Sequence, residues 1–211
     1  MSVALSQCMA YGAHLCIENK WNDAIDVFQR CLVVNPRYID ALYNLGVCYA
    51  NLGDFNEALG KYHEVLKLNS MDVEANYNSG VAHEKLGDLS SAIDAYKKTL
   101  EIDDRYLVAW VNIADCYYNR GLRTLRQPYQ EASGRPIPVP DDKLHTFFAI
   151  ESWSEEGLHY LTLATRQCDE ATRDFKLAAA CRDEAMERAD NQPLRFSLER
   201  RGKSLKIFLG V

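Results

Sequence analysis

The residue types that carry out most enzyme chemistry occur in this chain, but not at the spacings of known catalytic motifs. None of the five histidines (His14, His63, His83, His145 and His159) belongs to a His-Glu-x-x-His motif. The sequence has no Gly-x4-Gly-Lys-Ser/Thr phosphate loop and no Gly-x-Ser-x-Gly elbow. Glu155 and Glu156 are adjacent carboxylates, and adjacent positions of a helix point apart. We therefore predict that the protein is not an enzyme and holds no cofactor.

Cysteine is frequent enough to raise the question of a metal centre or of disulfides. The seven cysteines have no Cys-x-x-Cys pair, and no Cys/His cluster has zinc spacing. Their number is odd, and most stand among apolar residues of helical segments: Cys8, Cys16, Cys31, Cys48, Cys116, Cys168 and Cys181. These features are typical of reduced, buried thiols in a cytosolic protein, so we expect no metal.

Asparagines at a fixed period are the polar residues most suggestive of binding. Asn44, Asn78 and Asn112 are equally spaced along the chain, and each stands inside an apolar helical pattern. Asparagine is a mediocre helix former because its side chain competes for backbone hydrogen bonds. Its amide offers donors and an acceptor, so it can pair with a peptide unit. The recurrence therefore needs an explanation in the elements that carry it.

Charge and hydropathy exclude several broad classes of protein. The net charge of −6 argues against general nucleic-acid binding, which needs a broad basic surface. Residues 191–211 carry five Lys or Arg against one Glu, a net of +4, so the remainder is −10. No apolar run reaches the length of a membrane span, and the start of the chain lacks the basic region of a signal peptide. We expect a cytoplasmic protein, with association to a cilium or the cytoskeleton as a further option.

Aligning the chain with itself at the asparagine period gives a clear register. A small residue, an alanine, an aromatic residue, a leucine and a turn residue recur in turn: Gly12, Gly46, Gly80 and Ala114; Ala24, Ala58 and Ala92; Phe28, Tyr62 and Tyr96; Leu32, Leu66 and Leu100; Asn19, Gly53, Gly87 and Gly121. The small residue lets two helices approach closely. The turn position favours Gly or Asn, which tolerate positive φ. The pattern predicts helix–turn–helix repeats.

These positions resemble the tetratricopeptide repeat, whose pattern is W-x2-L-G-x2-Y…A-x3-F…P over about 34 residues. The second repeat reads Leu42, Leu45, Gly46, Tyr49, Ala58 and Tyr62. The resemblance implies an all-α solenoid of antiparallel helix pairs forming a right-handed superhelix. We place repeats at 5–38, 39–72 and 73–106 and a partial fourth at 107–126, so that the array occupies 1–126.

After Gly121 the expected second helix does not follow. Residues 127–141 include alternating Pro136, Pro138 and Pro140, which predict an inserted loop, either a plain surface loop or a docking segment for a partner. Residues 142–190 read as long helices, and the spacing of Ala171, Phe175 and Ala178 fits a degenerate fifth repeat around 152–185. Residues 191–211 read as a basic helix that either caps the solenoid or meets an acidic partner or membrane surface.

In this family the first helices of successive repeats line an inner groove. The register places ten residues there: Tyr43, Asn44, Val47, Tyr77, Asn78, Val81, Glu84, Asn112, Asp115 and Tyr118. The carboxylate clamp of chaperone-binding members is not matched, because its cationic positions hold other residues here. The asparagines instead resemble the asparagine ladder of the O-GlcNAc transferase superhelix, which binds the backbone of an extended peptide. A simpler alternative stays open, in which asparagine bridges neighbouring helices.

The resemblance implies a non-catalytic adaptor or scaffold that binds an extended peptide or helix of a protein partner in the groove. Tyr43, Tyr77 and Tyr118 would form the pockets that select the partner. The alternative is a structural subunit of a larger assembly, such as a ciliary or cytoskeletal complex, held by its convex face and basic tail. The sequence names neither the partner nor the pathway.

Overall fold

A computed structural model describes residues 3–134, 165 and 168–189. Within them the chain forms helices and no strand, in the order α1 (Val3–Ile17), α2 (Trp21–Val34), α3 (Ile39–Leu52), α4 (Phe55–Leu68), α5 (Val73–Lys85), α6 (Leu89–Ile102), α7 (Leu107–Ser133) and α9 (Asp169–Arg188). The chain divides into an N-terminal unit, Met1–Asp103, and a C-terminal unit, Asp104–Val211.

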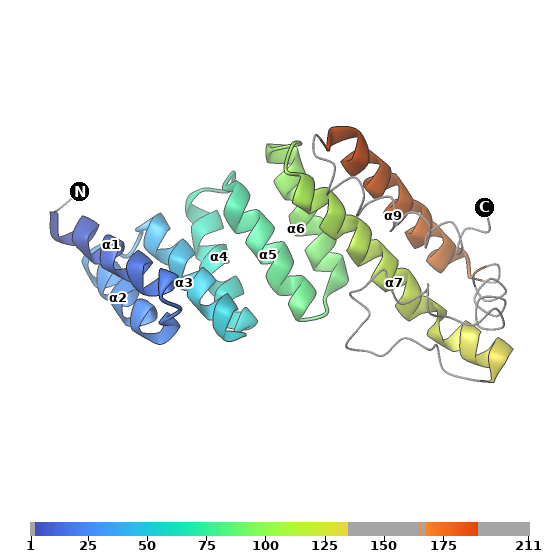
Figure 1. The fold of residues 1–211 in the computed structure, drawn as a ribbon, viewed down its shortest axis with the longest axis horizontal. Helices are drawn as coiled ribbons and strands as arrows, with labels where there is room; N and C mark the ends of the chain where they lie inside the picture. The colour runs from blue at the N-terminus through green and yellow to red at the C-terminus, as the bar shows by residue number, and fades with distance from the viewer. Residues whose placement is uncertain (1–2, 135–164, 166–167, 190–211) are drawn as a thin grey trace. The chain divides into compact units, whose positions relative to one another are not determined.

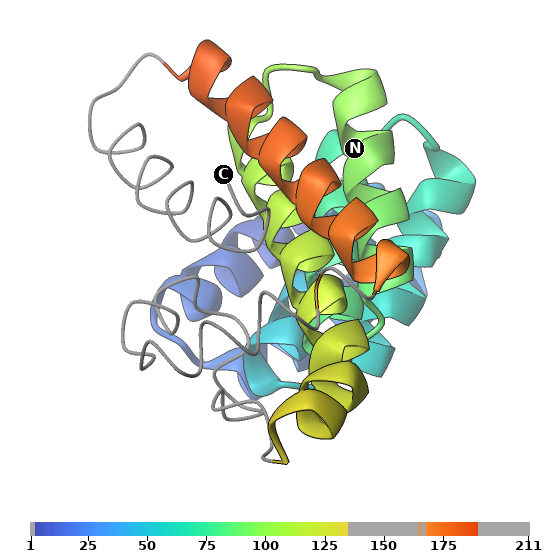
Figure 2. The same ribbon diagram turned by 90° about the vertical axis from the view of Figure 1, so that its right-hand side faces the viewer.

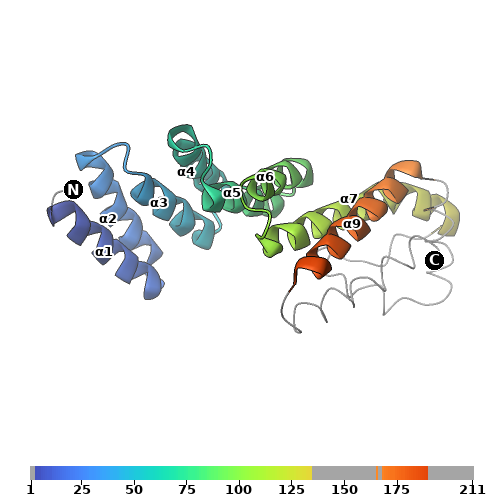
Figure 3. The same cartoon turned by 90° about the horizontal axis from the view of Figure 1, so that it is seen from above.

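The N-terminal unit consists of three helix pairs, and each pair corresponds to one of the predicted repeats. Helices α1 to α6 follow one another as antiparallel neighbours, each packed on the next (Figures 1 and 3). The turn inside each pair carries a left-handed residue: Asn19 (φ 57°), Gly53 (φ 87°) and Gly87 (φ 82°). Only Gly and a few polar residues adopt this conformation at low cost, which explains the recurring turn position.

Inside each pair, a glycine of the first helix faces an aromatic ring of the second. A Cβ atom added at Gly46 would lie 2.4 Å from Cε1 of Tyr62, far inside van der Waals contact. Gly12 stands in the same relation to Phe28, and Gly80 to Tyr96. All three rings are fully buried. The recurring glycine therefore keeps the first helix close enough for the ring to fill the core.

The C-terminal unit contains α7 and α9, which lie side by side and antiparallel (Figures 1 and 2). Helix α7 continues through Pro128 to Ser133, so the predicted loop at 127–141 is wrong for its first seven residues. Leu125 and Tyr129 on either side of the proline are buried, and their burial stabilises the extended helix. The left-handed residue that ends the helix is Gly134 (φ 68°).

Gly121 is not the turn residue that the repeat register predicts. It lies buried inside α7, and a Cβ atom there would meet Phe175 of α9 at 2.9 Å. Gly121 therefore takes the role of the glycine that faces a ring, which the register gave to Ala114. The two positions are seven residues apart and so share one face of the helix. Helix α9 packs two turns further along its partner than the register implies.

Helix α9 carries the features of a second repeat helix. Ala171, Phe175 and Ala178 are fully buried, like Ala58, Tyr62 and Val65 of α4. Its described partner is α7, so α9 pairs with the first helix of the fourth repeat across the intervening segment. The predictions for residues 142–164 and for the basic segment 191–211 lie outside the described residues.

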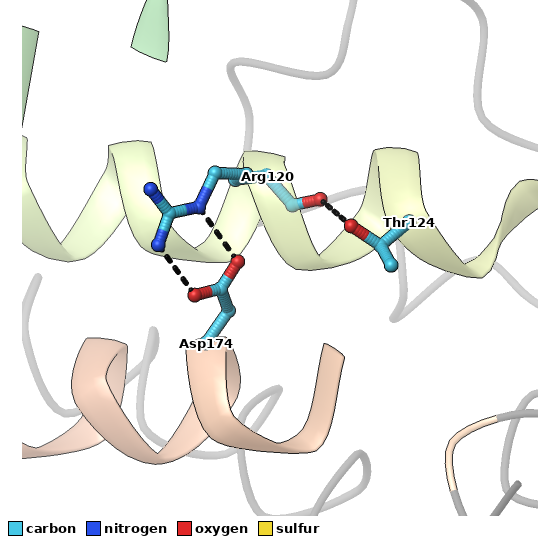
Figure 4. A network of polar contacts seen from close by, with 3 residues as sticks. All are labelled: Arg120, Thr124 and Asp174. Carbon is cyan, nitrogen blue, oxygen red and sulfur yellow. Dashed lines mark hydrogen bonds and ion pairs between the residues drawn. The ribbon is translucent and has the colours of Figure 1, made fainter. Parts of the chain in front are cut away.

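A bidentate ion pair fixes the pairing of α7 with α9. The Arg120 guanidinium donates from Nε to Asp174 Oδ2 at 2.8 Å and from a terminal nitrogen to Oδ1 at 2.7 Å (Figure 4). Asp174 is buried, and its bond to Arg120 raises the pKa of the guanidinium further. Arg120 also stacks over the ring of Tyr117. Since a guanidinium fork matches a carboxylate only in one orientation, the pair specifies the register of the two helices.

Candidate functional site

Seven of the ten predicted groove residues lie together on the first helices of the second and third pairs. We call them the tyrosine–asparagine face: Tyr43, Asn44 and Val47 of α3 with Tyr77, Asn78, Val81 and Glu84 of α5. All seven are half-buried. The amide nitrogen of Asn78 donates to the Tyr43 hydroxyl at 2.9 Å and so links the two helices. One asparagine of the predicted ladder therefore bridges neighbouring repeats, as the simpler alternative requires.

Each of the two asparagine side chains of this face donates a hydrogen bond and accepts none within the described ranges. Asn44 donates from Nδ2 to the backbone carbonyl of Asp40 at 2.7 Å, one turn earlier on the same helix. Asn78 donates from Nδ2 to Tyr43. The Oδ1 atom of each accepts no hydrogen bond from the described residues. Both amides are thus oriented by their donors and present an acceptor.

The tyrosines of the face are held against the core. Tyr43 packs on Tyr62 with ring centroids 6.1 Å apart, and Tyr77 packs on Tyr96 at 5.5 Å. Burial raises the pKa of Tyr43. The Tyr96 hydroxyl in turn donates to Glu84 at 2.9 Å, which places that carboxylate at the end of the face. The rings supply rigid apolar contact area rather than mobile surface groups.

The other three predicted residues lie on α7 in the C-terminal unit. Asn112 and Asp115 are half-buried, and each makes contacts within the fold. The prediction that Tyr118 lines a surface pocket is wrong. Its side chain is fully buried and packs on Phe175 at 5.7 Å between ring centroids, because α9 covers it. This burial raises the pKa of Tyr118 well above its usual value.

The cysteines are the other candidates for chemistry. All seven carry free thiols, and burial raises the pKa of both Cys31 and Cys48 to about 12. The Cys16 and Cys48 sulfurs lie 3.6 Å apart. In the described ranges, no three His, Cys, Asp or Glu side chains gather as metal ligands would. No helix in the same ranges combines the length and hydropathy of a membrane span.

Comparison with known families identifies the type of repeat that these helix pairs form. Residues 49–106 match one tetratricopeptide repeat family model and residues 27–60 match another. Residues 27–106 are tetratricopeptide repeats. The described helices have the all-α fold of a tetratricopeptide repeat solenoid. No curated protein matches the sequence.

Solved structures share this fold at low sequence identity. A crystal structure of MamA has a TM-score of 0.56 and 16% identity, over 98% of this chain and 92% of MamA. The first tetratricopeptide repeat domain of Spaghetti (RPAP3), bound to an HSP90 peptide, has a TM-score of 0.52 and 20% identity, over 53% of this chain and 89% of that one. A further MamA structure, MSR-1 C2, has a TM-score of 0.51 and 20% identity, over 56% of this chain and 67% of that one. At this identity the likeness concerns the fold.

Sequence reasoning missed a further asparagine of the same motif in the C-terminal unit. The second and third tetratricopeptide repeats read Tyr-Asn-Leu-Gly at 43–46 and Tyr-Asn-Ser-Gly at 77–80, and α7 reads Tyr-Asn-Arg-Gly at 118–121. Asn119 stands two residues before the glycine that faces a ring, as Asn44 and Asn78 do, whereas Asn112 keeps their position in the repeat register. Asn119 is buried, and its Oδ1 accepts no hydrogen bond from the described residues. The motif itself was the available signal, hidden because it stands seven positions later than the repeat period predicts.

Proposed function

We propose that the protein is a non-catalytic adaptor or scaffold whose tyrosine–asparagine face binds an extended segment of a protein partner. The observation that carries the proposal is the pair of oriented, unused Oδ1 acceptors on Asn44 and Asn78. An extended peptide exposes backbone N–H groups that such acceptors can satisfy. Because each amide is already held by its Nδ2 donor, little side-chain freedom would be lost on binding.

Two further features of the face support the proposal. Tyr43 and Tyr77 are rigid aromatic surfaces next to the acceptors, and aromatic residues are enriched at protein interfaces because they combine large apolar area with a polar tip. Glu84 adds a negative charge at one end. The partner segment would therefore be extended and would carry apolar side chains and a basic residue. The RPAP3 domain, which shares the fold, binds a peptide of HSP90.

The test is selection of peptides from a random library on the full chain, followed by affinity measurement on variants. Asn78→Ala should weaken a selected peptide about fivefold, the equivalent of one hydrogen bond of roughly 1 kcal/mol. Asn44→Ala should have a similar effect. Asn56→Ala, an exposed asparagine of α4 outside the face, is the matched control and should change nothing.

Tyr43→Phe separates binding from bridging. It removes the hydroxyl that accepts from Asn78 but keeps the Asn78 amide and the ring. If Asn78 contacts the peptide, Tyr43→Phe retains binding within about twofold while Asn78→Ala loses it. Equal affinities in the wild type and in both variants would mean that Asn78 only ties the repeats together, and the proposal would then be wrong.

A further inference from the structure

The third tetratricopeptide repeat departs from its neighbours at three positions of one helix face. Where the second repeat has Leu42, Leu45 and Tyr49, the third has Asn76, Ser79 and His83. In the repeat register the following positions are Trp110, Ile113 and Tyr117, so apolar and aromatic residues stand on both sides. Three polar replacements at i, i+3 and i+7 fall on a single stripe of α5.

This stripe lines an open surface pocket between α4, α5 and α6, which we call the cavity. The cavity has a volume of about 420 Å³, within the range of small-ligand sites. Asn76 and Ser79 lie at its lining and are almost fully buried, at 2% and 3% exposure. In the second repeat the position of His83 holds Tyr49, whose hydroxyl meets Gln29 of α2 at 3.5 Å. Histidine is shorter than tyrosine, so His83 occupies less space at this position.

The buried polar groups do not by themselves explain the replacement. Asn76 donates from Nδ2 to the carbonyls of Asp72 at 2.8 Å and Ser70 at 3.3 Å, and Ser79 donates to Ala75 at 2.7 Å. These bonds offset the burial of polar atoms, but a leucine at either position would need no such bond. A few buried polar side chains in a lining are compatible with a polar ligand.

The charges around the cavity indicate the sign of that ligand. Facing side chains come from three helices: His63 and Lys67 of α4, His83 of α5, and Asp94 and Lys98 of α6. Neither Lys67 nor Lys98 forms an ion pair with another described residue, whereas Lys61 of α4 pairs with Glu64 at 2.7 Å. Two such ammonium groups outweigh the one carboxylate of the lining. The cavity therefore favours an anion.

We propose that this cavity is a binding site for a phosphate group, carried either by a small phosphorylated molecule or by a phosphorylated side chain of a peptide. Lys67 and Lys98 contact the phosphate oxygens from opposite helices, since the lysine ammonium is a compact charge suited to phosphate. The ring N–H of His83 donates to the phosphate from α5. Asp94 accepts a hydroxyl or N–H from the rest of the ligand.

The site is separate from the tyrosine–asparagine face. At 100° per residue, the Asn76–Ser79–His83 stripe of α5 lies about 160° around the helix from the centre of Tyr77, Asn78, Val81 and Glu84. The two surfaces can therefore be occupied at once and tested independently. Failure of either proposal leaves the other standing.

The first experiment titrates the full chain with inorganic phosphate, followed by NMR of the histidine ring protons and by calorimetry. Lys98→Gln should weaken binding two- to fivefold, the range for an exposed charge pair. Lys85→Gln changes the net charge equally but stands on α5 outside the cavity, and it should leave binding unchanged. Equal weakening by both variants would mean non-specific attraction and would overturn the proposal.

A second variant restores the packing of the other repeats. Asn76→Leu, Ser79→Leu and His83→Tyr together should fill the cavity, abolish phosphate binding and leave the helix content unchanged. Phosphate binding that survives in this folded variant would place the anion elsewhere and refute the site. If the triple variant does not fold, the Lys98 and Lys85 comparison still decides.

Sulfate tests the part played by the imidazoles, because it keeps two charges across the range in which phosphate is protonated. Burial lowers the pKa of His83, so this ring is neutral at pH 7 despite Asp88 3.9 Å away. Sulfate should bind more tightly as the pH falls from 7 to 5.5, and less so in His83→Gln. A pH-independent affinity would contradict the assignment of His83. Comparing the affinities of a phosphoserine peptide and of inorganic phosphate then distinguishes the two carriers of the phosphate group. Tighter binding of the peptide indicates a phosphorylated side chain, and tighter binding of phosphate indicates a small phosphorylated molecule.

Discussion

The contact between glycine and ring inside each repeat gives the sharpest stability prediction. In Gly46→Ala the new Cβ would lie 2.4 Å from Tyr62 Cε1 and 2.8 Å from Cδ1. Carbon atoms pack best at about 3.5–4.0 Å, so the ring or the helix must move by about 1 Å. Tyr62 is fully buried and packs on Tyr43, which leaves it no room. Overpacking of this kind costs about 1–3 kcal/mol.

Gly60→Ala is the matched control. Gly60 lies exposed inside α4, and nothing stands within 4 Å of a Cβ placed there. The alanine should stabilise the helix by about 0.5–1 kcal/mol through lower backbone entropy in the unfolded chain. The same gain offsets part of the clash at Gly46, leaving a net loss of about 1 kcal/mol. The two variants should therefore differ by about 1–3 kcal/mol, the cost of the clash alone, although their substitution is identical.

Urea unfolding followed by far-UV circular dichroism measures this difference. The midpoint should fall for Gly46→Ala and rise for Gly60→Ala, with similar slopes if the unfolded states are alike. A Gly46→Ala protein as stable as the wild type would show that the ring adapts without cost. The glycine would then not be what brings the two helices of a repeat together, and the explanation given for the repeat register would be wrong.

Three further predictions concern α9 and the third repeat. Phe175→Ala should lower the free energy of unfolding by about 3–5 kcal/mol, whereas Lys176→Ala at the exposed neighbouring position should change it by less than about 0.5 kcal/mol. Equal effects of the two substitutions in urea titrations would contradict the packing of Phe175 in the core. Asp174→Asn should cost about 2 kcal/mol in the same assay, because Arg120 loses its carboxylate while remaining partly solvated; an unchanged midpoint would contradict the ion pair. The lowered pKa of His83 means that the unfolded state binds protons more readily, so stability should fall as the pH drops below about 6.5; thermal melts should show a weaker fall in His83→Gln, and an identical fall would assign the effect to other groups.

The fold of the N-terminal unit could be predicted from sequence because its repeats have equal length. A single shift of the chain against itself aligned the glycine, the ring and the turn residue, and the same three features define each helix pair in the structure. The structure confirms the prediction that the small residue lets two helices approach closely. The glycine is needed because Tyr62 and its equivalents occupy the space of a side chain.

The fourth repeat was harder to predict because its period changes. Gly121 fits the turn position if the period is constant and the ring-facing position if the period lengthens by two helical turns, and the local sequence does not distinguish the two. The choice depends on where Phe175 packs, and Phe175 lies far from Gly121 along the chain. Tertiary contact with α9 decides it. The same contact explains why Tyr118 is in the core although its spacing resembles that of a surface residue.

The asparagines illustrate why a position in a repeat does not fix a role. Asn44, Asn78 and Asn119 share one motif, yet the first bonds its own helix, the second bonds the preceding repeat and the third is buried. In all three, Oδ1 accepts no hydrogen bond from the described residues. An amide kept only to bridge helices needs its donor alone, and a lysine or a serine could supply one. The open acceptors of the half-buried Asn44 and Asn78 are what peptide binding requires, and that is why we favour it over bridging at these two positions. Asn119 is buried, so its acceptor does not support the proposal.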